Sequence, residues 1–250
     1  MTALAHASRR DTFSGRVVAR LADTGFDAPR ADQARVLVFD ALALRDDVCD
    51  ANALLDRTER ARALRFHYPR DRDVYVLAHA VWRIVLGECL RLAPSDVPLA
   101  RTADGQPRLP GTALSTSLSH SGDVVALAVS PAATIGVDIE TYPPRVDLDT
   151  LMPVFCTRAE IAQLSVLDDV ARRWAQMELW TRKEALLKAF GVGLLTDPAT
   201  TPAPATHLLL PPPEAAHYPP CITRNLEGCD RWIAAFAAPP AIRDIRLHTL

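Results

Sequence analysis

Two acidic motifs place the strongest constraint on how this chain folds. Residues 135–140 read IGVDIE. In an extended strand successive side chains point to opposite faces, so Asp138 and Glu140 share one face. Residues 180–188 read WTRKEALLK, a helical pattern that carries Glu184. We expect the fold to bring this strand and this helix together, which would gather three carboxylates around one point.

These three carboxylates predict a site for a hard, oxygen-loving cation. No pair of cysteines or histidines accompanies them, so Mg²⁺ is favoured over zinc. Lys183 is the neighbour of Glu184 and Lys188 lies one turn beyond it, where ammonium groups would neutralise phosphate. Such a site favours transfer from a pyrophosphate donor, with a carboxylate accepting the proton of an attacking hydroxyl. Each motif alone is also typical of a solvated strand face or of surface ion pairing.

A third segment, SLSHSGD at residues 117–123, leads into an apolar strand at residues 124–129. Backbone N–H groups, serine hydroxyls and the imidazole of His120 would converge there on an anion. The small residues of this segment predict a turn. A histidine in a turn can instead be a surface residue or a local hydrogen-bonding group.

Taken in order, SLSHSGD, GVDIE and WTRKEALLKAFGVGL closely resemble the signature motifs of the 4′-phosphopantetheinyl transferases, specifically the surfactin-activating, Sfp-like type. Residues 59–66 and 71–79 resemble the first-half helices of that type. Residues 104–109 read DGQPRL where members often read G-K-P. The resemblance covers roughly residues 35 to 240, and three motifs in the right order and spacing make it specific.

The resemblance implies a reaction. These enzymes move the phosphopantetheine arm of coenzyme A onto a serine of an apo acyl or peptidyl carrier protein in polyketide, peptide or fatty-acid synthesis. Adenosine 3′,5′-bisphosphate is released. Asp138, Glu140 and Glu184 then resemble the Mg²⁺ ligands, and Glu184 also resembles the general base for the carrier serine. Lys188 would assist at the pyrophosphate.

The donor, coenzyme A, is expected to bind several further positions. By resemblance these are Arg62, Gly105, Gln106, Pro107, Ser119, His120, Lys183 and Lys188. His120 and Arg62 would contact the 3′-phosphate, which an arginine fork and an imidazole can satisfy. Gln106 departs from the family lysine and removes one positive charge. Either coenzyme A affinity is weaker here or Arg108 substitutes, and the sequence leaves both open.

The resemblance implies an α+β fold of two pseudo-related α/β halves with the active site in the groove between them. We expect an N-terminal extension over residues 1–30, an N-terminal half over 31–132 and a C-terminal half over 133–250 that carries the metal site. Hydrophobic periodicity predicts strands at 35–39, 97–102, 115–118, 124–129 and 134–140, and helices at 51–65 and 70–92. A capping box at Thr157 and Glu160 predicts a short helix, and a long one runs from Asp169 to Gly191. The proline-rich residues 196–220 predict an extended loop with at most one edge strand, followed by a hairpin at 222–236.

Composition narrows the partners. The chain has 250 residues, a net charge of −2 and only 6% aromatic residues, which disfavours nucleic acid binding. Residues 57–72 contain six arginines and two acidic residues, so this segment is strongly basic. It predicts either a solvated helix face or a surface that steers acidic carrier proteins. Five cysteines lack C-x-x-C spacing, and neither a secretory segment nor a membrane span is evident. We therefore expect a soluble, cytoplasmic protein with reduced thiols, which family resemblance suggests is a monomer.

Two other functions use the same residues. A non-catalytic homologue would bind carrier proteins or coenzyme A without transfer. An unrelated Mg²⁺-dependent phosphohydrolase would release phosphate without a carrier and would leave the SHSG motif without an evident purpose.

Overall fold

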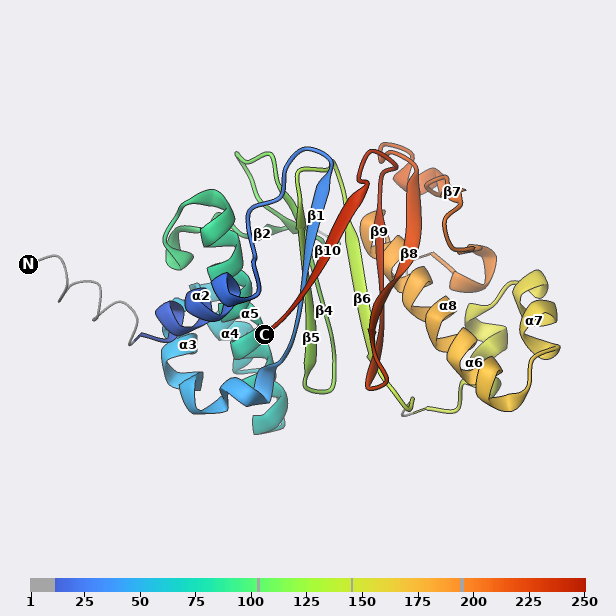
Figure 1. The fold of residues 1–250 in the computed structure, drawn as a ribbon, viewed down its shortest axis with the longest axis horizontal. Coiled ribbons are helices and arrows are strands. Elements are labelled where there is room, and N and C mark those ends of the chain that lie inside the picture. The colour runs from blue at the N-terminus through green and yellow to red at the C-terminus, as the bar shows by residue number, and fades with distance from the viewer. Residues whose placement is uncertain (1–11, 103, 145, 194–195) are drawn as a thin grey trace, which may run out of the picture.

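Two four-stranded sheets lie face to face between two outer layers of helices (Figure 1). The computed structural model describes residues 12–250 except 103, 145, 194 and 195. Alternate residues of the facing strands fill the space between the sheets, among them Val36, Val38, Val137 and Ile139. The mixed helix and sheet content agrees with the α+β class expected from the sequence. Within the described part of the chain, no helix has the length and apolar character needed to cross a bilayer.

The first sheet has the strand order β10-β1-β5-β4. Its strands span β10 Asp244–Thr249, β1 Gln33–Asp40, β5 Val124–Ser130 and β4 Ser115–Ser121. The strands predicted at 35–39, 115–118 and 124–129 are confirmed. The second of them continues to Ser121, so His120 lies in β4, paired with Val125, and not in the turn expected from the sequence. β10 runs parallel to β1, so this late segment completes the sheet of the first half instead of staying with residues 133–250.

Helices cover the outer face of this sheet. They are α2 Phe13–Asp23, α3 Val48–Leu54, α4 Arg57–Ala63 and α5 Pro69–Leu90. The long central helix α5 is buried on all sides from Asp73 to Gly87, because α2, α3 and α4 cover it. Its predicted span, 70–92, is confirmed to within two residues at each end.

Two predictions in this half are wrong. The single helix expected at 51–65 is two helices, because Leu55 is extended and Asp56 starts α4 with a capping box to Glu59. Residues 1–30 are not simply an extension, since α2 buries Phe13 and Val17 in the core of the first half. Residues 1–11 lie outside the described part of the chain.

The second sheet has the order β6-β9-β8-β7. Its strands span β6 Gly136–Thr141, β9 Trp232–Ala238, β8 Cys221–Cys229 and β7 Leu208–Leu209. The predicted strand at 134–140 and the hairpin at 222–236 are confirmed, and β7 is the edge strand within the proline-rich stretch.

Helix α8 (Asp169–Ala189) covers the outer face of this second sheet, with α6 (Leu148–Phe155) and α7 (Arg158–Ser165) beyond it (Figure 1). Gly136 allows α8 to approach β6, because a Cβ there would lie 1.9 Å from the carbonyl oxygen of Ala185. This close approach sets the distance between the two acidic motifs.

A short hairpin projects from the first half. Its strands are β2 Ala100–Arg101 and β3 Pro107–Arg108, so the strand expected at 97–102 is only two residues long. The turn passes through Gly105, whose φ of 86° favours glycine. Its position beside the end of α8 matters for the site described next.

Candidate functional site

The structure brings the two acidic motifs together where β6 meets α8. The Lys188 ammonium donates to Asp138 Oδ1 at 2.7 Å, and Trp180 Nε1 donates to Glu140 Oε1 at 3.3 Å. Glu184 lies one turn before Lys188, and its carboxyl is influenced by the charges of both β6 carboxylates. Strand alternation and helix periodicity together therefore aim the three carboxylates at one region.

Three serines of β4 bridge to β6 at a spacing of two residues. Ser117 Oγ accepts from the backbone N–H of Val137 at 3.1 Å. Ser119 Oγ donates to Asp138 Oδ1 at 2.7 Å, and Ser121 Oγ donates to Glu140 Oε2 at 2.6 Å. The edges of the two sheets are thus joined by side chains at the site.

Ser121 was missed by reasoning from sequence. The signal that could have found it is the S-x-S-x-S alternation, because residues two apart on a strand face the same way. From the sequence, Ser119 was expected to bind coenzyme A. In the structure its hydroxyl contacts both Asp138 and Lys188.

Burial and like charges disturb the titration of this cluster. Burial, followed by repulsion from Asp138, raises the pKa of Glu184 to about 7. Burial also raises the pKa of Glu140, against the hydrogen bond from Ser121. The positive charge of Lys188 offsets only part of this, so the site favours an additional cation.

Two buried carboxylate oxygens have no hydrogen-bond partner among the described residues, Asp138 Oδ2 and Glu184 Oε1. Unpaired buried oxygens of this kind are costly, and a divalent cation would satisfy both. No group of three described acidic, histidine or cysteine side chains is already close enough to form a complete ligand set. The chemistry of the donors fits Mg²⁺, while Lys188, Ser121 and Trp180 hold the remaining oxygens of the two β6 carboxylates.

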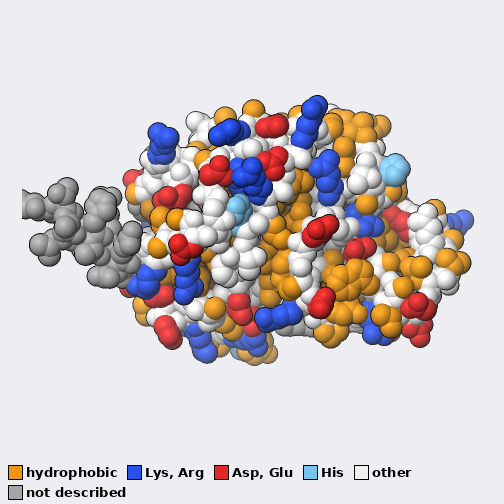
Figure 2. Space-filling view, in the orientation of Figure 1, with side chains coloured by type: hydrophobic (Ala, Val, Ile, Leu, Met, Phe, Trp, Pro, Cys, Tyr) orange, Lys and Arg blue, Asp and Glu red, His pale blue; other side chains and the backbone are white. Residues whose placement is uncertain are grey.

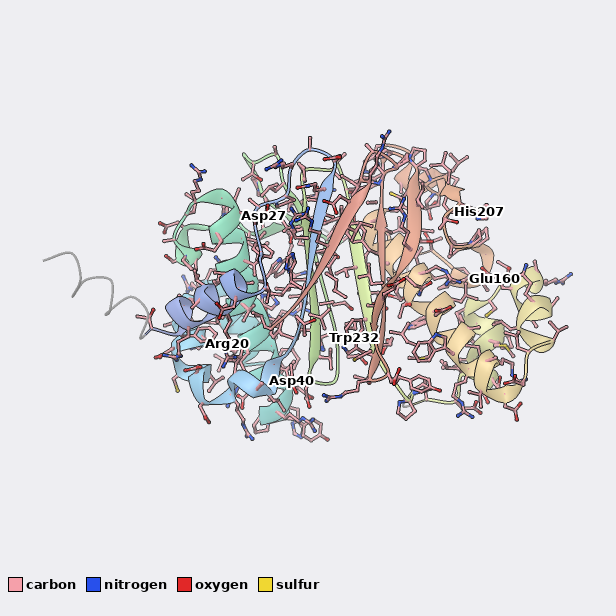
Figure 3. The ribbon with its side chains drawn as sticks, viewed as in Figure 1. Arg20, Asp27, Asp40, Glu160, His207 and Trp232 are labelled. Carbon is pink, nitrogen blue, oxygen red and sulfur yellow. The ribbon has the colours of Figure 1, made fainter. Side chains whose placement is uncertain are left out.

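Lys183 does not reach this site, and the prediction that it binds coenzyme A is wrong. Its side chain is fully buried on another face of α8, where Nζ contacts Glu160 at 2.7 Å and the carbonyl oxygens of Pro198 and Thr201 at 2.8 and 2.7 Å. Figure 3 shows Glu160 on the outer helical side of the second sheet. All three N–H groups of the Lys183 ammonium are thus engaged, and these contacts hold α7 and the proline-rich stretch against α8.

The residues expected at the 3′-phosphate lie on the side of the first half. His120 is on the face of β4 opposite Ser119, and loss of hydration followed by the charge of Lys188 lowers its pKa, which favours the neutral imidazole. The Arg62 guanidinium lies 6.0 Å from the centre of the Tyr75 ring. Arg101 was not assigned to the site from the sequence. Loss of hydration, followed by the positive charge of Arg62, lowers the pKa of Arg101, so the two guanidinium groups lie near each other. Two neighbouring guanidinium groups favour an anion between them.

The hairpin turn and the end of α8 enclose a hollow of about 190 Å³. Gly105, Gln106 and Pro107 form one wall, with Thr116, Ser117, Leu118, Ile135, Lys188, Gly191 and Gly193 forming the others. The structure therefore places the Gly-Gln-Pro turn beside Lys188, although the two lie far apart in sequence.

A second, apolar groove of about 360 Å³ opens beside Glu140 and Ser121. Its apolar walls come from Leu148, Leu151, Val154, Phe155, Met177 and Trp180. Figure 2 shows hydrophobic side chains gathered on the surface over α6, and Val154 is 63% exposed. Trp180 is half-buried in this groove, and its indole nitrogen donates to Glu140.

Two family descriptions match the chain on either side of residue 133. Residues 43–132 match the 4′-phosphopantetheinyl transferase N-terminal family, and residues 134–213 match the 4′-phosphopantetheinyl transferase superfamily, whose stretch contains Asp138, Glu140 and Glu184. Taken together, the two matches assign residues 43–132 and 134–213 of this chain to the 4′-phosphopantetheinyl transferases. The second match begins just before β6 and ends beyond α8, so it covers both acidic motifs of the site.

Curated relatives of this superfamily are similar over part of the chain. The 4′-phosphopantetheinyl transferase HetI of Nostoc sp. is 34% identical over 58% of this chain and 63% of its own length. A phosphopantetheinyl transferase of Thraustochytrium sp. is 31% identical over 56% of this chain and 54% of its own. The human L-aminoadipate-semialdehyde dehydrogenase-phosphopantetheinyl transferase is 26% identical over 54% and 48%. The matched part of the chain thus corresponds to between 48% and 63% of the length of these relatives.

Proposed function

We propose that this protein transfers the 4′-phosphopantetheine arm of coenzyme A to a serine of an apo carrier protein, as a member of the surfactin-activating, Sfp-like type. The observation that carries the proposal is that one buried oxygen of Asp138 and one of Glu184, from the two acidic motifs, have no hydrogen-bond partner in the part of the chain that the structure describes. The two family matches and the order of the three motifs support it. The transfer site would be the groove between the halves.

Asp138, Glu140 and Glu184 would hold Mg²⁺. When bound, the ion would neutralise the diphosphate of coenzyme A and stabilise charge on the leaving group. Ser119 and Ser121 keep Asp138 and Glu140 oriented by donating to one oxygen of each carboxylate.

The other residues would bind and orient the substrates. Lys188 places a positive charge beside Asp138, where it would contact the diphosphate. Glu184, at the same face of α8, would accept the proton of the carrier serine, because a serine hydroxyl needs a nearby base at neutral pH. Arg62, Arg101 and His120 would bind the 3′-phosphate through charge and N–H donation.

The apolar groove beside Glu140 supports the carrier assignment. It reaches the carboxylate cluster at one end, and exposed residues such as Val146 and Val154 border it. Apolar side chains of a docked carrier would be buried there, close to where its serine must react.

The test is to incubate the purified protein with coenzyme A, Mg²⁺ and a panel of apo carrier proteins, and to weigh each carrier by mass spectrometry. We expect a gain of one phosphopantetheine group that requires coenzyme A and is lost with a metal chelator. Binding of coenzyme A or carrier without any mass gain would favour a non-catalytic homologue. Phosphate release in the absence of carrier would favour a phosphohydrolase.

A further inference from the structure

The Gln106 side chain bridges the hairpin of the first half and the end of α8. Its Nε2 donates to the carbonyl oxygen of Lys188 at 3.0 Å and to that of Ala189 at 3.4 Å. Its Oε1 accepts from the Tyr218 hydroxyl at 2.7 Å. Both ends of the amide are therefore engaged, one with each of two other segments.

These contacts complete the C-terminal end of α8. The last carbonyl groups of a helix lack partners within the helix, and Gln106 supplies donors to two of them from another part of the chain. Thr134 Oγ1 donates to the Ala189 carbonyl as well. Gly191, at a φ of 67°, leaves room for the amide, because a Cβ there would lie 2.7 Å from Gln106 Oε1.

Tyr218 brings in the proline-rich stretch. The Arg108 guanidinium donates to the Tyr218 hydroxyl and lies 5.4 Å from the centre of its ring. A chain of donors thus runs from Arg108 through Tyr218 and Gln106 to the carbonyl of Lys188. Arg108 is engaged there, which argues against its standing in for the family lysine.

An amide meets both demands of this position, because it donates to the helix carbonyls and accepts from Tyr218. A lysine could donate to the helix carbonyls but could not accept from Tyr218, and it would add a positive charge near Arg108. A glutamate could accept from Tyr218 but would set a negative charge against the α8 carbonyls. The departure from the G-K-P pattern is therefore matched by its surroundings in this chain.

We propose that Gln106 and Tyr218 are positioning residues that fix the Gly-Gln-Pro turn against the end of α8 that carries Lys188. The turn and Lys188 both line the 190 Å³ hollow, so this clasp would set the shape of the space in which the nucleotide part of coenzyme A would bind. The inference rests on the proposed function for the identity of the ligand.

The variants Tyr218→Phe, Gln106→Glu and Gln106→Lys test the clasp. Tyr218→Phe keeps the ring and removes both hydrogen bonds of the hydroxyl, the one it donates to Gln106 and the one it accepts from Arg108. The loss of one such bond corresponds to a change of about 2- to 12-fold, which we take as the minimum effect. We expect the Kd of coenzyme A, measured by calorimetry without carrier, to rise by at least that factor. The KM for coenzyme A should rise in parallel, while the KM for the carrier stays unchanged. Gln106→Lys and Gln106→Glu should weaken coenzyme A binding at least as much.

The exposed Gln163 of α7 offers a matched control, and Gln163→Ala should leave every value unchanged. Unchanged coenzyme A affinity in Tyr218→Phe and Gln106→Lys would overturn the proposal even if their melting temperatures fall, because a purely structural contact predicts that result. Tighter binding by Gln106→Lys would also overturn it, by showing that Gln106 is simply a missing charge. Wild-type protein that binds coenzyme A without transferring it contradicts the proposed function alone, and one that does not bind it contradicts both.

Discussion

At the scale of single residues, the site stores unfavourable charge. Asp138, Glu140 and Glu184 lie in one partly buried cluster, and the ammonium of Lys188 compensates part of their negative charge. Placing like charges together lowers the stability of the folded protein, and such arrangements persist at functional sites because the ligand relieves them. The serines of β4 hold two of the three carboxylates in this arrangement.

Glu184→Gln should make the metal-free protein more stable while abolishing transfer. Because the pKa of Glu184 is raised from 4.5 to about 7, the ionised form is disfavoured in the folded state. The wild type therefore loses unfolding free energy as the pH rises from 4.5 to 7, by up to about 3 kcal/mol. In Glu184→Gln the amide does not ionise, so the unfolding free energy should not show this decrease. Chemical denaturation at pH 5 and pH 8 with a chelator measures the difference.

Added Mg²⁺ should raise the melting temperature of the wild type and have much less effect on Glu184→Gln. If the variant is less stable than the wild type at pH 8, the carboxylate is not repelled by its neighbours and its assignment to this cluster is wrong.

Ser121→Ala tests whether orientation of Glu140 matters for the metal. Removing a side chain that orients a ligand typically weakens metal binding 10- to 100-fold, so Mg²⁺ should stabilise the variant only at about that much higher concentration. Ser95→Ala, at an exposed serine, is the control. Equal Mg²⁺ dependence in both variants would show that Ser121 serves only to join β4 to β6.

At the scale of secondary structure, α8 presents two lysines to different surroundings. Lys188 is partly exposed at the site, whereas Lys183 is fully buried against Glu160. Their sequence contexts are alike, so helical periodicity alone did not reveal which one faces the substrate. Only the position of α7 and the proline-rich stretch, which are distant in sequence, decides this.

Lys183→Met and Lys188→Met form a matched pair on one helix. Breaking the buried ion pair of Lys183 should cost about 3 to 5 kcal/mol of unfolding free energy, since Glu160 is left buried without its partner. Transfer by the molecules that remain folded should persist. Lys188→Met should instead lose transfer with a smaller change in stability. If Lys183→Met instead lost kcat with little change in melting temperature, while Lys188→Met lost stability and kept kcat, Lys183 would be the lysine that binds coenzyme A.

Much of the local structure was predictable because its signals are local. The long helix α5, the strands β4, β5 and β6, and the capping box of α7 follow from periodicity and capping residues. The break at Leu55 also had a local signal, the Asp56 and Glu59 capping box, which lies inside an otherwise helical pattern. The contacts of Gln106 had none, because its partners are more than eighty residues away.

At the scale of the whole molecule, the two halves are interlocked. β10 follows all of the second sheet in the chain yet pairs with β1 of the first. The sheets also bury a shared apolar layer, to which β1 contributes Val36 and β6 contributes Val137. The site lies at the edge of this layer, between β4 and β6. Movement of one half relative to the other would therefore separate Ser119 and Ser121 from the carboxylates they orient.

The interlocked arrangement predicts that the halves unfold as one unit. Val36→Ala removes two methyl groups from the layer between the sheets, which should cost about 2 kcal/mol and speed exchange about 30-fold for amides that open globally. Hydrogen exchange measured by mass spectrometry should show the same increase in α5 and in α8, although only the first half carries the substitution. Val166→Ala, at an exposed valine, should change neither helix. Faster exchange in α5 with α8 unaffected would mean that the halves open independently, and a site built across them would then need a bound substrate to hold it together.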